Sequence, residues 1–337
     1  AYCNINRPED YAGIQESCMQ HSDGQSVANA FKAVAAANSD RTAVICGKEQ
    51  MKYGYLDRVS DDIAGAIENL GYPAGGCIAV MCARTVEHFA AVMGILKAGF
   101  YYLPLDDKLP MERLQYMVAK AKAAAIIALP STLPAEDAAG MPFDCPIILY
   151  DELLAFGNRE SEKTQRGKTT ENSIKNSKAS PYAYIIFTSG STGRPKGVKI
   201  KQSSLLNFSS EIGEKLFSLL NKEHLQVGVS ASFSFDLSVQ QIFPALLGGH
   251  TLNVIPEEAK RRPSSLEEEM RVLDVCDCTP LIMSLITDHL KNIGKAGAGP
   301  KMLLSGGEEM KKQTAAELLG VMPGCRLFNC YGPTECT

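Results

Sequence analysis

Residues 188–197, Thr-Ser-Gly-Ser-Thr-Gly-Arg-Pro-Lys-Gly, carry side chains suited to binding a polyphosphate, and they directly follow the apolar, strand-like residues 182–187. Glycines let the backbone approach an anion without interference from a Cβ atom, while hydroxyls, backbone N–H groups and an ammonium donate hydrogen bonds to phosphate oxygens. The hydroxyl donors are Thr188, Ser189, Ser191 and Thr192, the glycines are Gly190, Gly193 and Gly197, and Lys196 supplies the positive charge. We therefore interpret this segment as a phosphate-binding loop.

Two alternatives to a phosphate loop can be weighed on the residues themselves. The segment is not a Walker A loop, because Pro195 precedes the lysine and Gly197 follows it, where G-x-x-x-x-G-K-[ST] requires a glycine and a hydroxyl residue. A surface turn rich in serine and glycine would explain the small residues. It would explain neither Lys196 nor the position directly after a buried strand, so phosphate binding is the better interpretation.

A carboxylate stands among apolar residues in the stretch Phe-Ser-Phe-Asp-Leu-Ser, residues 233–238. A carboxylate in such surroundings is normally exposed or paired. Taken alone, Asp236 is best explained as the N-cap of a helix that begins nearby. Leu237 and Gln240 follow at i+1 and i+4, on neighbouring parts of the helix face that includes the aspartate.

The eleven cysteines are scattered along the chain and show no repeated spacing. A structural zinc site is the alternative for the C-x-C pair Cys276 and Cys278, but the usual zinc-ligand spacings are missing and the five histidines are dispersed. The pattern favours free, mostly buried thiols in a reducing compartment over a disulfide framework.

Composition narrows the class of protein. The chain has 337 residues, 45% of them hydrophobic, and a formal net charge of −4. It can therefore bury more than one domain's worth of core, and it has no basic footprint for nucleic acid and no polybasic membrane patch. The N-terminal residues lack the order of a signal peptide, and no apolar run reaches the ~18 residues of a membrane span. We expect a cytoplasmic protein whose partners include neither nucleic acid nor membrane.

Helical and strand-like segments alternate along most of the chain. Helices are predicted at residues 27–36, 56–70, 85–98 and 111–122, and strands at residues 40–46, 77–82, 101–104, 124–129, 182–187, 225–230, 251–255 and 302–305. Gly71 and Gly99 follow two of these helices, as C-cap glycines do. The alternation predicts an α/β fold with mainly parallel sheets covered on both faces.

Residues 158–180 differ abruptly from their surroundings, with Ile174 the only large aliphatic residue among charged and polar ones. Such a segment cannot bury enough apolar surface to offset the entropy lost on ordering, so we predict a mobile polar loop. Two βα layers are expected, one from about residues 1–70 with 200–337 and the other from about residues 71–200.

Residues 184–197, Tyr-Ile-Ile-Phe followed by the proposed phosphate loop, resemble the phosphate-loop signature of the adenylate-forming superfamily, which contains acyl-CoA synthetases, luciferases and the adenylation domains of nonribosomal peptide synthetases. Residues 96–106, Leu-Lys-Ala-Gly-Phe-Tyr-Tyr-Leu-Pro-Leu-Asp, are similar to the LKAGxAYxPLD segment of amino-acid-activating members. The resemblance implies the large N-terminal domain of these enzymes, with two stacked βαβ-type layers, and ATP and Mg²⁺ as cofactors.

Residues 329–335, Asn-Cys-Tyr-Gly-Pro-Thr-Glu, resemble the family's N-x-Y-G-P-T-E element, which implies that Tyr331 stacks on adenine, Thr334 contacts the α-phosphate and Glu335 holds Mg²⁺. An aromatic face, a hydroxyl and a hard oxygen ligand suit these tasks. Residues 305–308, Ser-Gly-Gly-Glu, resemble the adenine-side turn, with an ordinary strand-to-helix turn as the alternative. The resemblance thus implies Thr188, Lys196 and Glu335 as catalytic residues and nucleotide contacts from Thr188, Ser189, Gly190, Ser191, Thr192, Gly193, Lys196, Gly307, Glu308, Tyr331 and Thr334.

The Phe-Asp-Leu-Ser stretch matches the family's F-D-x-S element, whose aspartate holds the substrate's α-ammonium in amino-acid-activating members. The resemblance therefore assigns Asp236 to an amino acid substrate. It also implies a pocket lined by Asp236, Leu237, Gln240, Asp277, Leu304, Gly306 and Cys330, similar to that of glutamine- or glutamate-activating domains. Gln240 and Asp277 can donate to and accept from a carboxamide, and a second buried carboxylate makes a charged side chain costly, so glutamine ranks above glutamate.

The implied activity is that of a ligase that activates an amino acid as aminoacyl-AMP and loads it onto the phosphopantetheine arm of a carrier protein, beside neighbouring synthetase domains. After the position of Glu335 the family continues with a ribose-binding aspartate and a small C-terminal domain that carries a bridging lysine. We therefore expect a truncated core with incomplete activity. Gln202 also departs from the family, since many relatives have a histidine near this position.

Other classes remain as alternatives. Within the superfamily, a D-alanine–carrier ligase or an acyl-CoA synthetase would carry the same phosphate loop, and an acyl-CoA synthetase would prefer a simple carboxylic acid. From a different class, the chain could be a non-catalytic binding module that keeps only the fold. The intact loop hydroxyls, Lys196 and Glu335 argue against that module.

Overall fold

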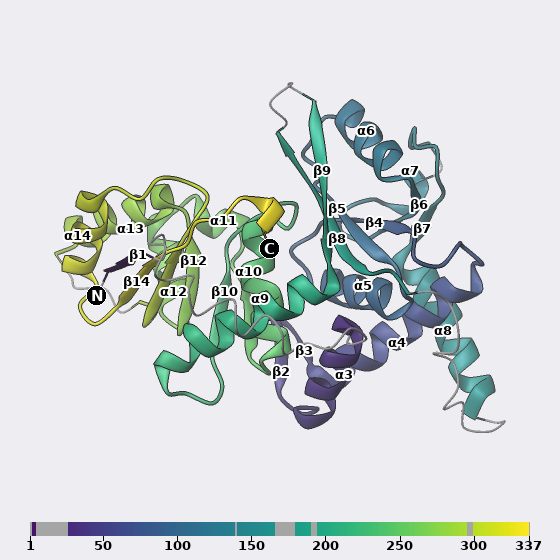
Figure 1. Ribbon diagram of the computed structural model, residues 1–337, viewed down its shortest axis with the longest axis horizontal. Helices are drawn as coiled ribbons and strands as arrows, with labels where there is room; N and C mark the ends of the chain where they lie inside the picture. Colours follow the sequence, from purple (N-terminus) through teal and green to yellow (C-terminus); the bar gives the residue numbers. More distant parts are fainter. Residues whose placement is uncertain are drawn as a thin grey trace. The chain divides into compact units, whose positions relative to one another are not determined.

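The computed structural model describes residues 2–4, 26–138, 140–165, 179–189, 194–294 and 299–336. The chain divides into two compact units, and Figure 1 shows their helices and strands. Unit 1 comprises Ala1–Gly24, Arg41–Gln50 and Leu206–Thr337, and unit 2 comprises Gln25–Asp40 and Met51–Leu205. Each unit is built on its own sheet.

The sheet of unit 1 has eight strands in the order β1-β14-β13-β12-β10-β11-β2-β3. From β1 to β2 every strand runs parallel to its neighbour, as the alternation of helices and strands predicted. The strands are β1 (Tyr2–Asn4), β2 (Thr42–Cys46), β3 (Glu49–Lys52), β10 (Gln226–Val229), β11 (Thr251–Val254), β12 (Val275–Cys278), β13 (Met302–Ser305) and β14 (Arg326–Asn329).

Helices cover both faces of this sheet. Cys276, Cys278 and Leu303 point to one face and belong to the buried cluster formed with α11 to α14. Asp277 lies between the two cysteines, so it points to the opposite face, where Gln240 of α10 contacts it. The helices of unit 1 are α9 (Gln202–Lys215), whose first residues belong to unit 2, α10 (Asp236–Leu247), α11 (Glu257–Lys260), α12 (Pro263–Met270), α13 (Pro280–Asn292) and α14 (Lys312–Val321), with the 3₁₀ turns η1 (Phe217–Leu220) and η2 (Thr334–Cys336).

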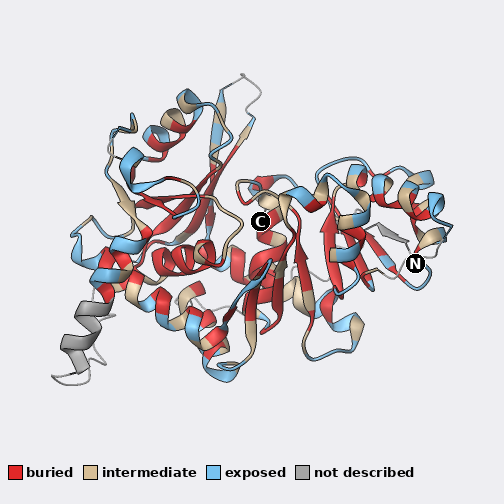
Figure 2. Ribbon diagram, turned by 180° about the vertical axis from the view of Figure 1, so that it is seen from behind, coloured by how far each residue is buried: buried red, intermediate tan, exposed pale blue. Residues whose placement is uncertain are grey.

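The sheet of unit 2 has six strands in the order β7-β6-β4-β5-β8-β9. All neighbours are parallel except β8 and β9, which form an antiparallel pair. In Figure 2 the central strands are buried along their length, as expected for a sheet covered on both faces. The strands are β4 (Cys77–Met81), β5 (Tyr101–Leu105), β6 (Ala123–Ala128), β7 (Ile147–Leu149), β8 (Tyr182–Ser189) and β9 (Pro195–Lys201).

The helices of unit 2 are α3 (Val27–Ala37), α4 (Tyr53–Asn69), α5 (Val86–Lys97), α6 (Met111–Ala121), α7 (Ala135–Ala138) and α8 (Tyr150–Gln165). α4 and α5 cross closely at Gly94, where a Cβ atom would lie 2.4 Å from a methyl carbon of Ile63. Gly71 and Gly99 follow α4 and α5 with φ of +71° and +80°, which confirms their C-cap roles. No helix of the described residues is long and apolar enough to cross a membrane.

The expected division of the chain into layers was wrong for two helices. α3 and α4 were assigned to the layer of residues 200–337, but the structure places both in unit 2. The apolar face of α4 packs against α5, and helical spacing shows that a helix has such a face without showing which partner it meets.

The segment predicted as a mobile polar loop is also shorter than expected at its N-terminal end. α8 continues through Gln165, so residues 158–165 are helical. The physical reason is that this stretch, although polar, is rich in glutamate, arginine, lysine and glutamine, which favour the helix. Residues 166–178 lie outside the described residues, and the segment lies within unit 2 instead of joining the two units.

Candidate active site

The proposed phosphate loop connects the antiparallel strands β8 and β9 of unit 2. Thr188 pairs with Lys196 and Ser189 with Pro195, and directly opposite residues on antiparallel strands share a face of the sheet. The Thr188 hydroxyl lies 3.5 Å from the backbone oxygen of Lys196, and the Lys196 side chain is exposed. The Thr188 hydroxyl and the Lys196 backbone therefore lie beside each other at the base of the loop, while Gly190, Ser191, Thr192 and Gly193 lie outside the described residues.

Gly197 has a different role from the one suggested by the sequence. It lies within β9, where a Cβ atom would be 2.7 Å from Ile185 Cδ1 and 3.1 Å from Phe187 Cζ. The glycine thus makes room for two apolar side chains of β8. It does not serve the close approach of an anion.

In unit 1, Asp236 is the first residue of α10, and the N-cap position belongs to Phe235, which makes no side-chain capping bond. The N-cap alternative for Asp236 is therefore wrong. The half-buried carboxylate of Asp236 instead accepts a hydrogen bond from the hydroxyl of Thr334 in η2. A hydrogen bond thus connects Asp236, which the family resemblance assigns to the α-ammonium of the substrate, with Thr334, which it assigns to the α-phosphate of ATP.

The other predicted pocket residues lie at the carboxyl ends of neighbouring strands. Asp277 on β12 is in register with Leu304 on β13, so the two point to the same face, and Gly306 follows Leu304 by two residues. A Cβ atom at Gly306 would lie 2.9 Å from Leu237 Cδ1 of α10 and 3.5 Å from the backbone oxygen of Cys330. Only glycine leaves this space open between the helix and the end of β13.

Gln240 and Asp277 form a direct contact beneath α10. The Gln240 Nε2 atom donates to Asp277 Oδ2 at 2.8 Å, while Asp277 Oδ1 is buried and has no hydrogen-bond partner among the described residues. Burial, followed by the nearby Cys278, raises the pKa of the Asp277 carboxyl well above its usual range, although the glutamine contacts lower it. Burial of this carboxyl therefore favours its neutral form over its charged form.

Three residues assigned to the nucleotide directly follow predicted substrate residues in the sequence of unit 1. Gly307 has φ of +81°, which only glycine adopts readily, and it turns the chain after β13. Glu308 is exposed and does not begin a helix, since α14 starts at Lys312. The Tyr331 side chain is 77% exposed, so its ring is available for stacking.

The residues present fit a Mg²⁺ ion bound together with phosphates. Glu335 is an exposed carboxylate in η2, one residue after Thr334. Mg²⁺ in nucleotide sites is typically held by one or two carboxylates and by phosphate oxygens instead of a full protein cage. Among the residues that the structure describes, no group of three or more metal-binding side chains occurs.

Gln241 of unit 1 and Gln202 of unit 2 are buried glutamines with structural contacts. Gln241, which is 2% exposed, accepts hydrogen bonds from the backbone N–H groups of Ser230 and Ala231 at 3.0 and 3.3 Å. Gln202, where the family often has a histidine, is a structural residue of unit 2. Its side chain accepts from the Val27 N–H at 2.9 Å and donates to the Ser180 carbonyl at 2.8 Å.

Comparison with known proteins agrees with this geometry. The family described as "AMP-binding enzyme" matches residues 31–337. Bacitracin synthase 1 from Bacillus licheniformis is 32% identical over 310 residues, which cover 91% of this chain and 6% of that protein. The chain therefore spans only a small part of this curated relative.

Solved structures share the fold. The nonribosomal peptide synthetase FmoA3 superposes with a TM-score of 0.79 at 21% identity, covering 99% of this chain and 34% of that one. The N-terminal subdomain of NpsA from Klebsiella oxytoca, solved with 3-hydroxybenzoyl-AMSN, has a TM-score of 0.71 at 19% identity and covers 92% of this chain and 73% of that one. The chain belongs to the AMP-binding enzyme family.

Proposed function

We propose that this chain supplies the nucleotide and amino acid sites for the activation of an amino acid as aminoacyl-AMP. The observation that carries the proposal is the half-buried Asp236 carboxylate at the start of α10, the helix whose Leu237 packs against Gly306 and whose Gln240 contacts Asp277. A carboxylate held there can pair with an α-ammonium group, which simple carboxylic acids lack.

In the proposed reaction, a carboxylate oxygen of the amino acid forms a bond to the α-phosphorus of ATP. The bond between the α-phosphorus and its bridging oxygen breaks, and pyrophosphate leaves with the electron pair. Lys196 and the hydroxyls of the loop disperse negative charge on the phosphates. Glu335 would hold a Mg²⁺ ion, which when bound neutralises charge on the phosphate oxygens.

We infer that the preferred side chain is a carboxamide, and glutamine fits the residues best. Burial raises the pKa of Asp277, which weakens repulsion by a charged Asp277 as a reason for glutamine. The geometry of Gln240 gives a stronger reason. The Gln240 amide nitrogen is bound to Asp277, so its Oε1 atom remains as an acceptor without a partner among the described residues. An acceptor favours the NH₂ group of glutamine over the carboxylate of glutamate.

The proposed partner after activation is the phosphopantetheine thiol of a carrier protein. The length of bacitracin synthase 1, of which the match covers 6%, supports the idea that such domains work within larger assemblies. The thiol would displace AMP from the activated amino acid and retain it as a thioester.

The test is calorimetric titration of this chain with aminoacyl sulfamoyl-adenosines, which are non-hydrolysable mimics of aminoacyl-AMP. The panel contains the glutaminyl, glutamyl, leucyl and phenylalanyl compounds, with benzoyl sulfamoyl-adenosine and AMP as references. We expect the glutaminyl compound to bind most tightly. Tightest binding of the leucyl or phenylalanyl compound would refute the carboxamide assignment, and tightest binding of the benzoyl compound would refute amino acid recognition itself.

A further inference from the structure

The stretch between β10 and α10 carries Asp236 and is held by contacts within it, such as that of the Phe235 N–H with the Ser232 carbonyl at 3.0 Å, and by contacts with other elements. α10 begins without a side-chain N-cap, so the usual local device for fixing a helix start is absent there. The best-anchored residue near it is Ser230, which directly follows β10. Its backbone N–H donates to Gln241 Oε1 at 3.0 Å, and its carbonyl accepts from Lys260 Nζ at 3.0 Å.

Gln241 joins three structural elements through one buried carboxamide. Its Oε1 atom accepts from the backbone of Ser230 and Ala231, and its Nε2 atom lies 3.4 Å from the backbone oxygen of Asp277 on β12. The Ser230 hydroxyl donates to the same Asp277 oxygen. The end of β10, the end of β12 and the body of α10 are therefore connected at a single side chain that is 2% exposed.

These contacts close residues 230–241 into a ring. The chain leaves β10 at Ser230, passes through Asp236 at the start of α10 and returns by the Gln241 side chain to Ser230. Closing a segment in this way removes conformations that would place Asp236 elsewhere. The same carboxamide touches the backbone of Asp277, the residue that orients Gln240.

We propose that Gln241 is a positioning residue for amino acid recognition, which sets the place of Asp236 by tying the start of α10 to the ends of β10 and β12. Its side chain is 2% exposed and contacts the backbone of Ser230, Ala231 and Asp277, so it acts from beneath the start of α10. This inference rests on the proposed function, because it concerns the recognition of the amino acid part of the ligand.

The chemistry of the contacts requires glutamine at this place. The carboxamide oxygen accepts from the N–H groups of Ser230 and Ala231, and the carboxamide nitrogen lies within reach of the Asp277 carbonyl. A carboxamide supplies both an acceptor and a donor. Methionine has a similar length but leaves two buried N–H groups without a strong acceptor. Glutamate accepts from both N–H groups but cannot donate to the Asp277 carbonyl when it is ionised. The two replacements therefore predict a graded effect, with Gln241→Met more severe than Gln241→Glu.

The experiment compares glutaminyl sulfamoyl-adenosine with AMP, both titrated against the whole chain and its variants. For Gln241→Met we expect the affinity for the glutaminyl compound to fall about 10- to 30-fold, while the affinity for AMP stays within about twofold. Gln241→Glu should give a smaller loss for the glutaminyl compound only. Lys97→Met serves as a control, because Lys97 bonds Asp57 and Asp61 within unit 2 and lies outside the proposed site.

A double-mutant cycle separates positioning from a general structural role. If Gln241 acts through Asp236, then Gln241→Met should cause little further loss in a chain that already carries Asp236→Asn. Additive losses would overturn the proposal, as would equal losses of AMP and glutaminyl-compound affinity.

The outcomes also separate this inference from the function on which it rests. If the unaltered chain binds the glutaminyl compound well and Gln241→Met leaves that affinity unchanged, only the positioning role is wrong. If the unaltered chain binds none of the aminoacyl compounds more tightly than AMP, the amino acid site itself is wrong, and the positioning role falls with it. Should Gln241→Met fail to fold, Gln241→Glu and its cycle with Asp236→Asn decide the question alone.

Discussion

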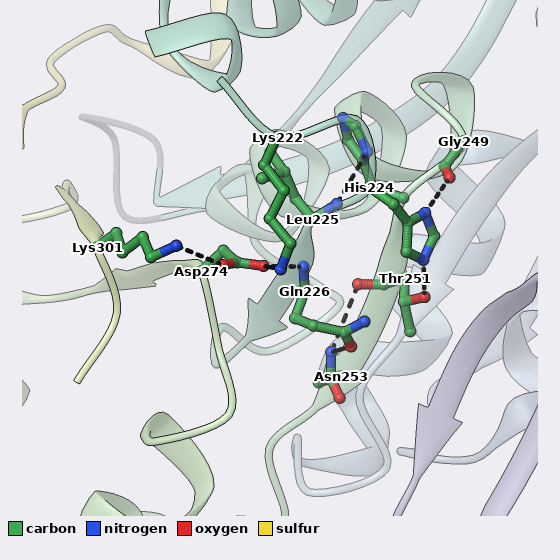
Figure 3. Close-up of polar contacts among 10 residues, drawn as sticks. Lys222, His224, Leu225, Gln226, Gly249, Thr251, Asn253, Asp274 and Lys301 are labelled. Atoms are coloured by element: carbon green, nitrogen blue, oxygen red, sulfur yellow. Dashed lines mark hydrogen bonds and ion pairs between the residues drawn. The ribbon is translucent and has the colours of Figure 1, made fainter. Parts of the chain in front are cut away.

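At the edge of the unit 1 sheet where the strands begin, polar side chains are bound to one another and to the backbone. At the edge where the strands end, two buried polar atoms have no partner among the described residues. Figure 3 shows the first edge. Asp274, just before β12, accepts from Lys222 Nζ at 2.5 Å and from the Gln226 N–H at 2.9 Å, and Lys301 lies 3.8 Å away.

A histidine at the same edge is bound through both ring nitrogens. His224 Nδ1 lies 2.8 Å from the Gly249 oxygen, and Nε2 lies 2.8 Å from the Thr251 hydroxyl oxygen, which itself donates to the Thr42 carbonyl. These contacts connect the starts of β2, β10 and β11. The polar side chains at the edge where the strands begin therefore form a structural network, in which they bind one another and the backbone.

The opposite edge has the marks of a binding site. Asp277 Oδ1 and Ser305 Oγ are buried without a hydrogen-bond partner among the described residues, and they lie at the ends of β12 and β13. Unpaired buried polar atoms cost stability and persist where they serve a function. Ligands of open parallel sheets bind outside the carboxyl ends of the strands, so the difference between the two edges agrees with where the proposed substrate pocket lies.

The largest expected effect would break the network at the starting edge. Asp274→Ala leaves the Gln226 N–H and the half-exposed Lys222 without their buried carboxylate partner, and the loss of these charge-assisted hydrogen bonds costs about 3 kcal/mol. We expect the free energy of unfolding, measured with urea, to fall by that amount, while the affinity for glutaminyl sulfamoyl-adenosine stays unchanged. Lys301→Ala is the control, because that lysine is 63% exposed and should cost under about 0.5 kcal/mol. A loss of ligand affinity in Asp274→Ala would show that the two edges are not separate in function.

The second prediction concerns pH at the same edge. Burial, followed by the charge of His224, lowers the pKa of His250 to about 4, from about 6.5 in the unfolded chain. Between pH 6.5 and pH 4, His250 takes up a proton in the unfolded chain but not in the folded chain. Stability is therefore present above about pH 6.5 and is lost by about 2–3 kcal/mol as the pH falls to 4.

His250→Asn removes this titration and should flatten the pH dependence of unfolding of unit 1. Urea titrations at several pH values from 7 to 4 would measure it. His88 in unit 2, whose pKa is lowered to about 3 by burial and then by Arg84, should still cause a loss of stability in the same direction. An unchanged slope in His250→Asn would count against the low pKa of that residue.

The third prediction concerns the edge where the strands end. Asp236→Asn removes the charge proposed to hold the α-ammonium, and charge-assisted hydrogen bonds contribute about 2 kcal/mol. We expect the affinity for glutaminyl sulfamoyl-adenosine to fall about 30-fold, with little change in the free energy of unfolding. Asp236→Asn thus mirrors Asp274→Ala, since one carboxylate serves ligand binding and the other stability. A loss of stability without a loss of affinity would contradict this assignment.

Sequence patterns predicted much of the fold but could not assign helices to units. Strand and helix spacing correctly predicted elements such as α3, α6, β4 and β13, because the period of apolar residues reflects burial directly. The same spacing placed α4 in the wrong unit. Which sheet a helix covers depends on contacts such as that of Gly94 with Ile63, which lie 31 positions apart and leave no local signal.

Some residues of the candidate site could be predicted from sequence motifs, whereas others depend on contacts that only the fold creates. Asp236, Leu237 and Gly306 could be named because they match motifs with fixed spacing, and the structure brings Leu237 and Gly306 into contact. Gln241 could not be named, since a glutamine within a helix has no motif and its role arises only when β10 and β12 lie beside α10. The network around Asp274 escaped prediction for the same reason.

The smallest expected effect concerns Asp277, and it tests whether this buried carboxyl near the end of β12 lowers the stability of the fold. The pKa of Asp277 is raised by burial, so the folded chain keeps a proton that the unfolded chain loses above about pH 4. This group therefore favours the folded state at low pH, and the advantage is lost as the pH rises toward neutrality, which is the opposite of the trend at His250. Asp277→Asn stays neutral at every pH and still accepts from Gln240.

We expect Asp277→Asn to raise the free energy of unfolding at pH 7 by about 1 kcal/mol, and to leave it nearly unchanged near pH 4, where the unfolded aspartate is also largely protonated. Urea unfolding at both pH values, beside Asp274→Asn as the matched change at the other edge, measures the difference. Asp274→Asn should destabilise unit 1 at pH 7, because its carboxylate is paired with lysines. If Asp277→Asn and Asp274→Asn both lowered the stability at pH 7, Asp277 would be a structural group like Asp274. The contrast between the two edges of the sheet would then not hold.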